Sequence, residues 1–416
     1  MMRTLRGRKA EAFVLALEQR GAADLARVEK QVRRIVADVR KHGDRALRRY
    51  AEKWDGLKPR QPLRVADAEL EQAWNAVPEQ FKQALKTASL NIRQYCEWQM
   101  PQPWRNAVAP GIQVGQVVRP LQSAGCYVPG GRYPLPSTML MTVIPAQVAG
   151  VEQIRVVSPR PALETLATAH FLGVREFFRI GGAQAIAALA YGAASVPKVD
   201  KIVGPGNLFV TAAKKMVAFD CGIDFLAGPT EVVIVSEHGE PRFIAADLVA
   251  QAEHDPDALA VFITASISLA KQVAAEVKRA AANNTIAKLS LKQNGAVLVA
   301  GSHDQALDFA NRIAAEHITI NEEDLAHVCN AGSIFVGDYS PQAAGDYAAG
   351  PNHVLPTGGV ARFRGGLGVH DFVKTISVQQ LSRDGLDRIG AAVITLAEAE
   401  GLKAHAESIR VRSANA

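Results

Sequence analysis

The chain has 416 residues, with 47 lysines and arginines against 41 aspartates and glutamates, and therefore a formal net charge of +6. A hydrophobic fraction of 48% suits a globular protein with enough chain for two or three domains. No apolar run reaches membrane-spanning length, and acidic residues are interspersed among the basic ones without basic–aromatic alternation, so we expect no membrane and no nucleic-acid partner.

The cysteines and the N-terminus indicate a cytoplasmic protein. Cys96, Cys126, Cys221 and Cys329 form no C-x-x-C pair, as is typical of free thiols in a reducing compartment. Residues 1–13 are basic but lack a following apolar core and a small-residue cleavage site, so we expect no signal peptide. Cys126 lies beside a glycine-rich loop and could be a nucleophile, but no base neighbours it and a packed thiol is favoured.

The first hundred residues are predicted to be helical. Apolar side chains keep a 3.6-residue period from Leu25 to Val39, and Gly43 interrupts the pattern. A second helical region covers residues 67–99. A cluster of three prolines then predicts a hinge: Pro101, Pro103 and Pro110.

Short apolar runs alternate with amphipathic segments in the rest of the chain, which predicts right-handed crossovers and mainly parallel sheets. The expected strands are 154–157, 177–180, 201–203 and 232–235, followed after a further helix by 259–264, 296–299 and 334–336. The expected helices between them are 162–172, 183–191, 207–219, 266–282 and 304–315. This alternation of strands and helices occurs in two parts of the chain and suggests two sheets of one kind, although no residue-level repeat is visible. A Gly-, Pro- and Asn-rich segment at 347–368 is expected to be a functional loop, and 385–412 a helical tail.

Three glycine loops are expected at the carboxyl ends of parallel strands, where such sheets bind ligands. They contain Gly130–Gly131, Gly181–Gly182 and Gly204-x-Gly206. Glycine allows close approach of a ligand, and a helix N-terminus favours phosphate. None completes G-x-G-x-x-G, since Phe209 stands where the last glycine belongs. Each loop alone could be a tight turn, but three in one sheet favour a ligand.

Polar residues that could carry chemistry are scattered along the second half. Gln251 and His254 are three residues apart and share one face of a helical turn, so they could begin a metal site, although a capped helix end is the ordinary explanation. Glu316 and His317 lie at a helix-to-strand junction and could exchange protons near neutral pH, or only close a charged helix end. Asp346 and its neighbours flank the loop at 347–368, where turn chemistry is the plain alternative.

Taken together, these stretches resemble the histidinol dehydrogenase family. The matching motifs occur in family order from Cys126 to His405: CYVPGG, GGAQAIAALA, VDKIVGPGN, AGPTEVV, AQAEHDPDA, EHITI, GDYAAGPNHVLPTGG and LAEAEGLKAH. The resemblance covers nearly the whole chain, and the combination of motifs is highly specific.

The resemblance implies a zinc enzyme that oxidises an amino alcohol to the aldehyde and then to the acid, using two NAD molecules per turnover. By motif matching, the zinc ligands would be Gln251, His254, Asp346 and His405, the last supplied by the partner subunit of a homodimer. Glu316 and His317 match the catalytic pair, with His317 as the base for the alcohol and Glu316 as the group that activates water. The matched substrate contacts are Thr230, His353 and Glu400, together with His317 and the zinc ligands. Tyr127, Gln184 and Asn207 match NAD contacts.

The implied fold is α/β, with two Rossmann-like domains built on parallel sheets, without the complete dinucleotide fingerprint, and with small helical segments at both ends. Residues 21–126 and 231–367 would form the domain with the metal and catalytic residues. Residues 127–230 would form an inserted cofactor-binding domain. Residues 1–20 would be a helical segment, and 368–416 would contact the partner.

Some positions depart from the family pattern and leave alternatives open. Thr230 stands where many members carry Ser, and Pro351 where some carry Thr. Arg132 and Arg364 add cations near the expected site, which would suit a paralogue that oxidises another polar, possibly sulfonated, alcohol. His353 and Glu400 favour histidinol, because an acidic partner suits its ammonium group. A metal-dependent hydrolase and a metal-stapled binding protein are two further classes, against which the glycine loops and the Glu316–His317 pair argue.

Overall fold

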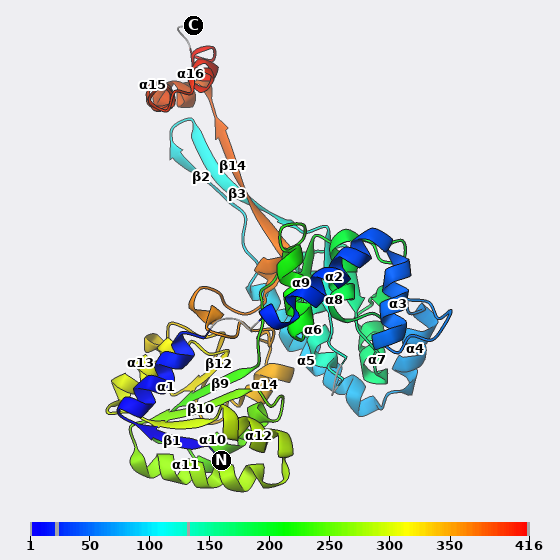
Figure 1. The fold of residues 1–416 in the computed structure, drawn as a ribbon. Coiled ribbons are helices and arrows are strands. Elements are labelled where there is room, and N and C mark those ends of the chain that lie inside the picture. Colours follow the sequence, from blue (N-terminus) through cyan, green and yellow to red (C-terminus); the bar gives the residue numbers. More distant parts are fainter. Residues whose placement is uncertain (1, 21–24, 131–133, 414–416) are drawn as a thin grey trace.

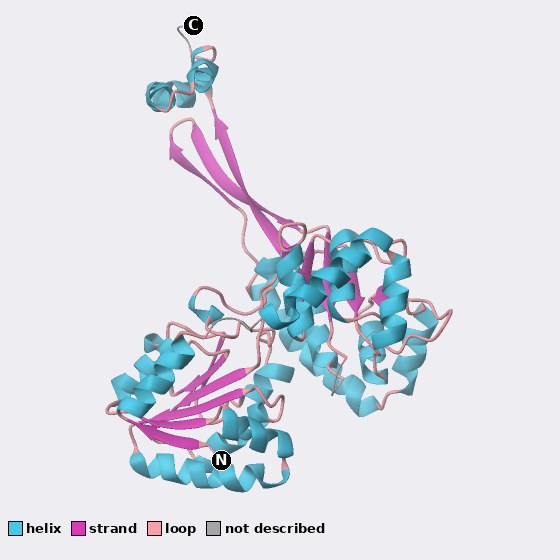
Figure 2. Ribbon diagram, in the orientation of Figure 1, coloured by secondary structure: helices cyan, strands magenta, loops and turns pink. Residues whose placement is uncertain are grey.

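The computed structural model describes residues 2–20, 25–130 and 134–413. Two lobes are each built on a parallel β-sheet with helices on both faces, and a narrow antiparallel arm carries two helices at its tip (Figures 1 and 2). The α/β fold with two parallel-sheet cores is therefore confirmed. Among the helices that the structure describes, none is long and apolar enough to cross a membrane.

One lobe contains a five-stranded sheet in the order β6-β5-β4-β7-β8, with all neighbours parallel. Its strands are β4 (Ser123–Tyr127), β5 (Gln153–Val157), β6 (Glu176–Phe178), β7 (Lys201–Val203) and β8 (Gly222–Ile223). Counted within the lobe, the order is 3-2-1-4-5, so the winding reverses between β4 and β7. Ligands bind at such a switch point in open α/β sheets.

Eight helices cover this sheet, and four of them come from the N-terminal region. One face packs on α4 (Asp67–Ala76), α5 (Glu79–Trp98), α6 (Pro136–Ala149) and α7 (Leu163–Phe171); the other packs on α2 (Ala26–His42), α3 (Asp44–Trp54), α8 (Gly182–Tyr191) and α9 (Leu208–Val217). The expected grouping of residues 21–126 with 231–367 differs from this arrangement. The apolar stripe of α2 predicted which face of the helix is buried, but it did not indicate on which of the two sheets the helix packs.

The other lobe contains a six-stranded parallel sheet in the order β1-β11-β10-β9-β12-β13. Its strands are β1 (Arg3–Arg6), β9 (Glu231–Val235), β10 (Leu259–Thr264), β11 (Ala296–Val299), β12 (His317–Ile320) and β13 (Ser333–Val336). Without β1, the order is again 3-2-1-4-5, which supports the expectation of two sheets of one kind. The N-terminal segment, expected to be helical, therefore opens with an edge strand before α1.

Helices cover both faces of the six-stranded sheet as well. α1 (Arg8–Glu18) and α13 (His303–Ile313) pack on one face, and α10 (Pro241–Ala252), α11 (Ile267–Ala280) and α12 (Thr285–Gln293) on the other. α14 (Gln342–Tyr347) follows β13. Short 3-10 turns occupy Ala281–Asn283, Glu322–His327, Val360–Arg362 and Val369–Phe372.

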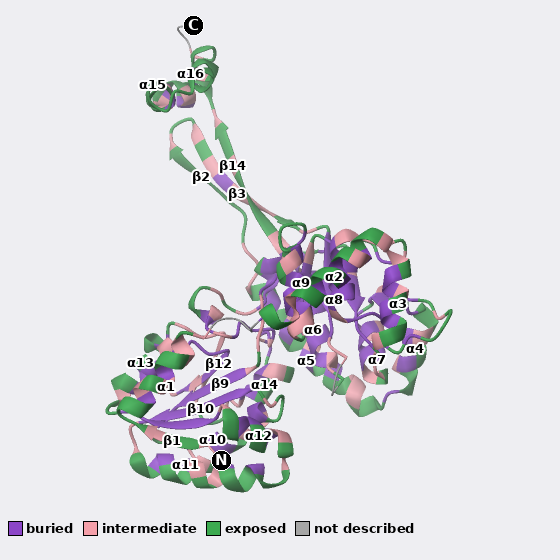
Figure 3. Cartoon of the chain, in the orientation of Figure 1, coloured by how far each residue is buried: buried purple, intermediate pink, exposed green. Residues whose placement is uncertain are grey.

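The arm combines β2 (Trp104–Ala109), β3 (Ile112–Pro120) and β14 (Val373–Leu381) in one antiparallel sheet. It ends in α15 (Arg383–Ala399) and α16 (Lys403–Arg410), and its surface is largely exposed (Figure 3). Sequence reasoning expected a hinge here. Two of the three prolines precede β2, and Pro110 with Gly111 (φ 81°) forms the β2–β3 turn.

Candidate functional site

A cluster of polar side chains lies at the amino edge of the six-stranded sheet, where β9 and β12 begin side by side. Thr230 directly precedes β9, Glu316 precedes β12, and His317 is the first residue of β12. The Glu316 carboxylate accepts hydrogen bonds from the Thr230 hydroxyl at 2.5 Å and from the backbone N–H of Glu231 at 2.9 Å. Both Glu316 and His317 are buried.

The hydrogen bonds of His317 define which ring nitrogen is free. Nδ1 donates to the backbone carbonyl of Glu231 at 3.0 Å, and because a carbonyl can only accept, Nδ1 carries the hydrogen. Nε2 faces the Asp346 carboxylate at 3.4 Å. Nε2 is buried and has no hydrogen-bond partner within the part of the chain that is described. This nitrogen is therefore the one that can exchange a proton with a ligand.

The three ionisable groups of this cluster shift one another's pKa values. Burial raises the pKa of Glu316 to about 7, against opposing effects of His317, the Thr230 hydroxyl and the Glu231 amide. Burial lowers the pKa of His317, but the Glu316 and Asp346 carboxylates outweigh it and raise that pKa to about 9. Burial also opposes ionisation of Asp346, yet His317 holds the pKa of this carboxyl below its usual value. The arrangement stabilises an imidazolium ion between two carboxyl groups.

The predicted metal ligands of α10 and α14 face the same cluster. Gln251 is buried in the last turn of α10, and its amide nitrogen donates to the Thr230 hydroxyl. His254 follows the helix and is exposed, and its charge contributes to lowering the pKa of Asp346. Three of the four predicted ligands therefore come from one region of one chain, at or just after the ends of helices.

His353 joins this cluster to the other lobe. Its Nδ1 donates to the backbone carbonyl of Asp346 at 2.7 Å, and its Nε2 lies 3.2 Å from the hydroxyl of Thr138 on α6. The neighbouring Asn352 amide donates to the carbonyl of Met141, also on α6, at 2.6 Å. Burial lowers the pKa of His353. The loop expected at 347–368 thus fastens the cluster to the five-stranded lobe.

Glu400 and His405 are not brought to the cluster within one chain. Both are exposed, at the end of α15 and on α16, at the tip of the arm and away from α10 and α14 (Figure 1). Within residues 2–20, 25–130 and 134–413, no three His, Cys, Asp or Glu side chains gather closely enough to hold a metal ion.

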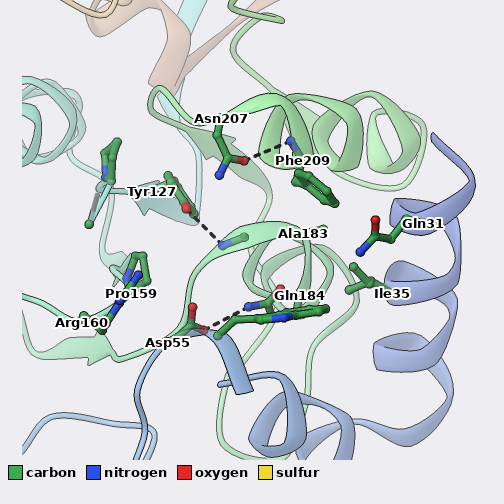
Figure 4. Close-up of a pocket in the computed structure, with 14 residues that line it drawn as sticks. Gln31, Ile35, Asp55, Tyr127, Pro159, Arg160, Ala183, Gln184, Asn207 and Phe209 are labelled. Atoms are coloured by element: carbon green, nitrogen blue, oxygen red, sulfur yellow. Dashed lines mark hydrogen bonds between the residues drawn. The ribbon is translucent and has the colours of Figure 1, made fainter. Parts of the chain in front are cut away.

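A separate cavity of about 400 Å³ lies in the five-stranded lobe, at the carboxyl edge of its sheet (Figure 4). Tyr127 ends β4, Gln184 lies in the first turn of α8 after β6, and Asn207 precedes α9 after β7, so all three predicted cofactor contacts line this cavity. The other wall consists of α2 and α3, including Ile35 and Trp54. The cavity therefore occupies the switch point between β4 and β7.

Hydrogen bonds hold the glycine loops around the cavity, and those of Asp55 are buried. The backbone N–H of Gly182 donates to the Tyr127 hydroxyl at 3.1 Å, and the Asn207 side chain caps α9. Asp55 accepts from the backbone N–H of Gly181 and from the Gln184 amide, both at 3.0 Å. Sequence analysis missed Asp55. The only local signal was the Asp-Gly turn that ends α3.

Comparisons with known proteins agree with this geometry. The sequence profile of the histidinol dehydrogenase family matches residues 18–413. The chain is 46% identical over 411 residues to a histidinol dehydrogenase of Geobacter metallireducens, covering 95% of this chain and 94% of that relative. It is 47% identical over 417 residues to one of Methanosarcina mazei, covering 97% and 96%. A crystal structure of histidinol dehydrogenase from Elizabethkingia anophelis superimposes with a TM-score of 0.93 at 33% identity, covering 99% and 98% of the two chains. The chain belongs to the histidinol dehydrogenase family.

Family membership decides between the classes left open by the sequence. The chain is an oxidoreductase of the histidinol dehydrogenase type, with an oxidation role in histidine biosynthesis, and not a hydrolase or a binding protein. Arg364, considered as a cation for an anionic substrate, is instead paired with Asp371 and lies over the Phe225 ring. Arg132 lies outside the described residues. Cys126 is a packed thiol, because it is fully buried in the core of the five-stranded lobe, and this burial raises its pKa to about 12.

Proposed function

We propose that the chain oxidises L-histidinol through L-histidinal to L-histidine, with one zinc ion per subunit and two NAD molecules per turnover. The observation that carries this proposal is the buried Glu316–His317 pair, bonded to the backbone of Glu231 and facing Asp346. Relatives named histidinol dehydrogenase, about 46% identical to this chain, support the same substrate.

The donor groups of the cluster fit a zinc ion. Asp346 offers a half-buried carboxylate, His254 an exposed imidazole, and Gln251 an amide whose nitrogen is used by Thr230, so its oxygen is the available donor. Zinc takes nitrogen and oxygen ligands of these kinds. We propose that Gln251, His254 and Asp346 hold the ion and that the partner subunit's His405 completes the site.

The cavity in the five-stranded lobe fits a dinucleotide. It lies at the switch point of a 3-2-1-4-5 parallel sheet, and the helices α8 and α9 begin at its rim. Helix N-termini favour phosphate groups. We propose that Tyr127, Gln184 and Asn207 bind NAD there, and that binding needs no G-x-G-x-x-G because α2 and α3 close the cavity.

The chemistry divides between the two members of the pair. Zinc would supply a positive centre that orients the substrate, and NAD would supply the hydride acceptor. His317 in its neutral form takes the alcohol proton at Nε2 as hydride leaves the same carbon, and the carboxylates on both sides stabilise the imidazolium ion that results. Glu316 then takes a proton from a water molecule as the oxygen of that water bonds to the aldehyde carbon. As the hydrate forms, His317 returns its proton from Nε2 to the former aldehyde oxygen, and it takes a hydroxyl proton again as the hydrate loses a second hydride.

Substrate binding would use residues from both lobes and from a second chain. Thr230 and His353 face the cluster, whereas Glu400 and His405 lie on the arm. We propose that the active form is a homodimer whose arms exchange these two residues, with Glu400 pairing with the substrate ammonium. Buried free thiols at Cys96, Cys126 and Cys221 support a cytoplasmic location.

Two substitutions test the assigned roles. We expect His317→Asn to cripple both oxidations, and Glu316→Gln to impair mainly the oxidation of added aldehyde. NADH absorbance with histidinol and, separately, with histidinal measures the two steps. Normal aldehyde oxidation by Glu316→Gln would contradict the role of Glu316 in activating water.

A substrate panel separates histidinol from the alternative substrates. Histidinol, an uncharged diol and a sulfonated diol are compared with and without a chelator. We expect histidinol to be preferred and the chelator to abolish its oxidation. A preference for the sulfonated diol would instead support the paralogue, which the pairing of Arg364 with Asp371 disfavours.

Subunit mixing tests the shared site. Homodimers of His405→Asn and of His317→Asn should each be nearly inactive. Mixed and re-equilibrated, half of the dimers are hybrids with one complete site, so about a quarter of wild-type activity should return if His405 acts across the interface. Failure to regain activity in verified hybrids would contradict the exchange.

A further inference from the structure

We infer that Arg20 and Glu231 are positioning residues that hold Glu316 and His317 in place, an inference that rests on the proposed function. Glu231 contacts both members of the pair through its backbone: its N–H donates to the Glu316 carboxylate at 2.9 Å, and its carbonyl accepts from His317 Nδ1 at 3.0 Å. The placement of one residue's backbone therefore determines the geometry of the pair.

The side chain of Glu231 is held by a two-pronged ion pair. Arg20 Nε and Nη2 lie 2.9 and 2.8 Å from the two carboxylate oxygens. The side chains of Arg20 and Glu231 are only 17% and 6% exposed. Such a fork fixes direction as well as distance, which a lysine cannot do in the same way.

Arg20 also reaches the segment that leads into Glu316. Its Nη1 donates to the carbonyl of Ile313 at 2.9 Å, at the end of α13 and three residues before Glu316. On the other side, the Glu231 carboxylate accepts from the backbone N–H of Gly358 at 3.1 Å, in the loop that carries His353. One guanidinium and one carboxylate thus connect three segments that converge on the cluster.

A second arginine, Arg312, serves as a control because it forms ion pairs in the same region without contacting Glu231. Arg312 pairs with Glu11 at 2.7 Å, Glu18 at 3.1 Å and Asp308 at 3.3 Å, and so joins the same two helices, α1 and α13. Besides these carboxylates, the Arg312 side chain lies over the Phe309 ring, and within the described part of the chain it makes no hydrogen bond or ion pair with Thr230, Glu231, Glu316 or His317. A role limited to holding α1 on the sheet predicts equal effects of substituting Arg20 and Arg312.

The experiment compares Arg20→Met, Arg20→Lys and the control Arg312→Met in the full-length enzyme. For Arg20→Met we expect kcat with histidinol to fall about 10- to 100-fold, because a shift of about 1 Å in a reacting group costs that much. The KM for NAD should change less than about two-fold, since the cavity lies in the other lobe. Arg20→Lys should recover part of kcat, whereas Arg312→Met should lower the melting temperature and leave kcat near wild type.

A second measurement does not depend on activity. The Nδ1–H resonance of His317, assigned by its absence in His317→Asn, reports the bond to Glu231 in ¹⁵N-histidine-labelled enzyme. It should shift or broaden in Arg20→Met and not in Arg312→Met. Unchanged kcat and an unchanged resonance in Arg20→Met would overturn the inference. If Arg20→Met does not fold, Arg20→Lys and Glu231→Gln carry the same test. A wild type inactive with histidinol would refute the proposed function alone, because the resonance still tests the positioning.

Discussion

Lys214 and Asp224 form the most buried ion pair of the described chain, and its removal offers a quantitative test of how the cavity is built. The ammonium lies 2.6 Å from the carboxylate, and the two side chains are 4% and 1% exposed. The pair also holds the turn at Gly204: Lys214 donates to its carbonyl at 2.6 Å, and Asp224 accepts from its N–H at 2.8 Å. This turn leads to Asn207 in the cavity wall.

Lys214→Met removes the cation and leaves the Asp224 carboxylate buried. Breaking one partner of a buried pair costs about 3–5 kcal/mol, because the other charge is left uncompensated. Adding Asp224→Asn should restore much of that loss, since the amide oxygen can still accept from Gly204 while no charge is left buried. Affinity for NAD should fall in Lys214→Met, because the carbonyl of Gly204 loses its partner and the turn is free to move.

Urea unfolding followed by tryptophan fluorescence measures the loss of unfolding free energy in the five-stranded lobe, which contains Lys214 and Asp224. All four tryptophans lie between Trp54 and Trp104, in the five-stranded lobe and the arm, and none lies in the six-stranded lobe. A loss below about 1 kcal/mol in Lys214→Met would refute the reasoning, since it lies within the range of surface pairs. A double variant no more stable than Lys214→Met would also refute it.

Three further predictions concern the cavity and the pH dependence of stability. Gly130→Ala should raise the KM for NAD several-fold, because a Cβ there would lie 1.8 Å from the Pro159 carbonyl and force the loops after β4 and β5 apart. Burial raises the pKa of Asp247 from 3.8 to about 6, so the folded state binds this proton more tightly and loses stability as pH rises through 6; Asp247→Asn should raise the melting temperature at pH 8 and hardly at pH 4. Burial opposes ionisation of Asp371, but Lys201 and Arg364 outweigh it and lower its pKa, so its stabilisation is present above pH 4 and lost in acid; Asp371→Asn should flatten the fall of melting temperature on acidification.

Local patterns predicted the elements well wherever tertiary contacts do not decide them. Short apolar runs between amphipathic segments located β5, β7, β10 and β11 nearly to the residue, and the 3.6-residue period of apolar side chains located α2 up to Gly43. The arm was missed because two of its strands, β2 and β14, are largely exposed and lack the apolar–polar alternation of a half-buried sheet. The assignment of α2 and α3 to a lobe was missed because an apolar helix face does not specify its partner.

The rule that parallel sheets bind ligands at their carboxyl edges led to a cavity in one sheet only. It led from the glycine loops to the cavity beside Tyr127, Gln184 and Asn207. In the six-stranded sheet the corresponding edge does not carry the cluster, since Thr230, Glu316 and His317 lie where β9 and β12 begin. No local signal marks this reversal. Glu316 and His317 were singled out by their chemistry and by the resemblance, and their bonds to Glu231 could not be foreseen.

The reversal has an electrostatic reason. Strands and helices run in opposite directions in both lobes, so helices begin at the carboxyl edge of a sheet and end at its amino edge. Helix N-termini favour anions and C-termini favour cations, by about 0.3–1 kcal/mol each at exposed sites and more when partly buried. The cavity is bordered by the N-termini of α8 and α9, as suits the phosphates of NAD, whereas the cluster lies at the C-termini of α10 and α13, as suits zinc, an imidazolium and a substrate ammonium. The proposed hydride transfer requires these opposite edges to face each other, and the contacts of His353 with Thr138 and of Asn352 with Met141 join the cluster to α6 of the other lobe.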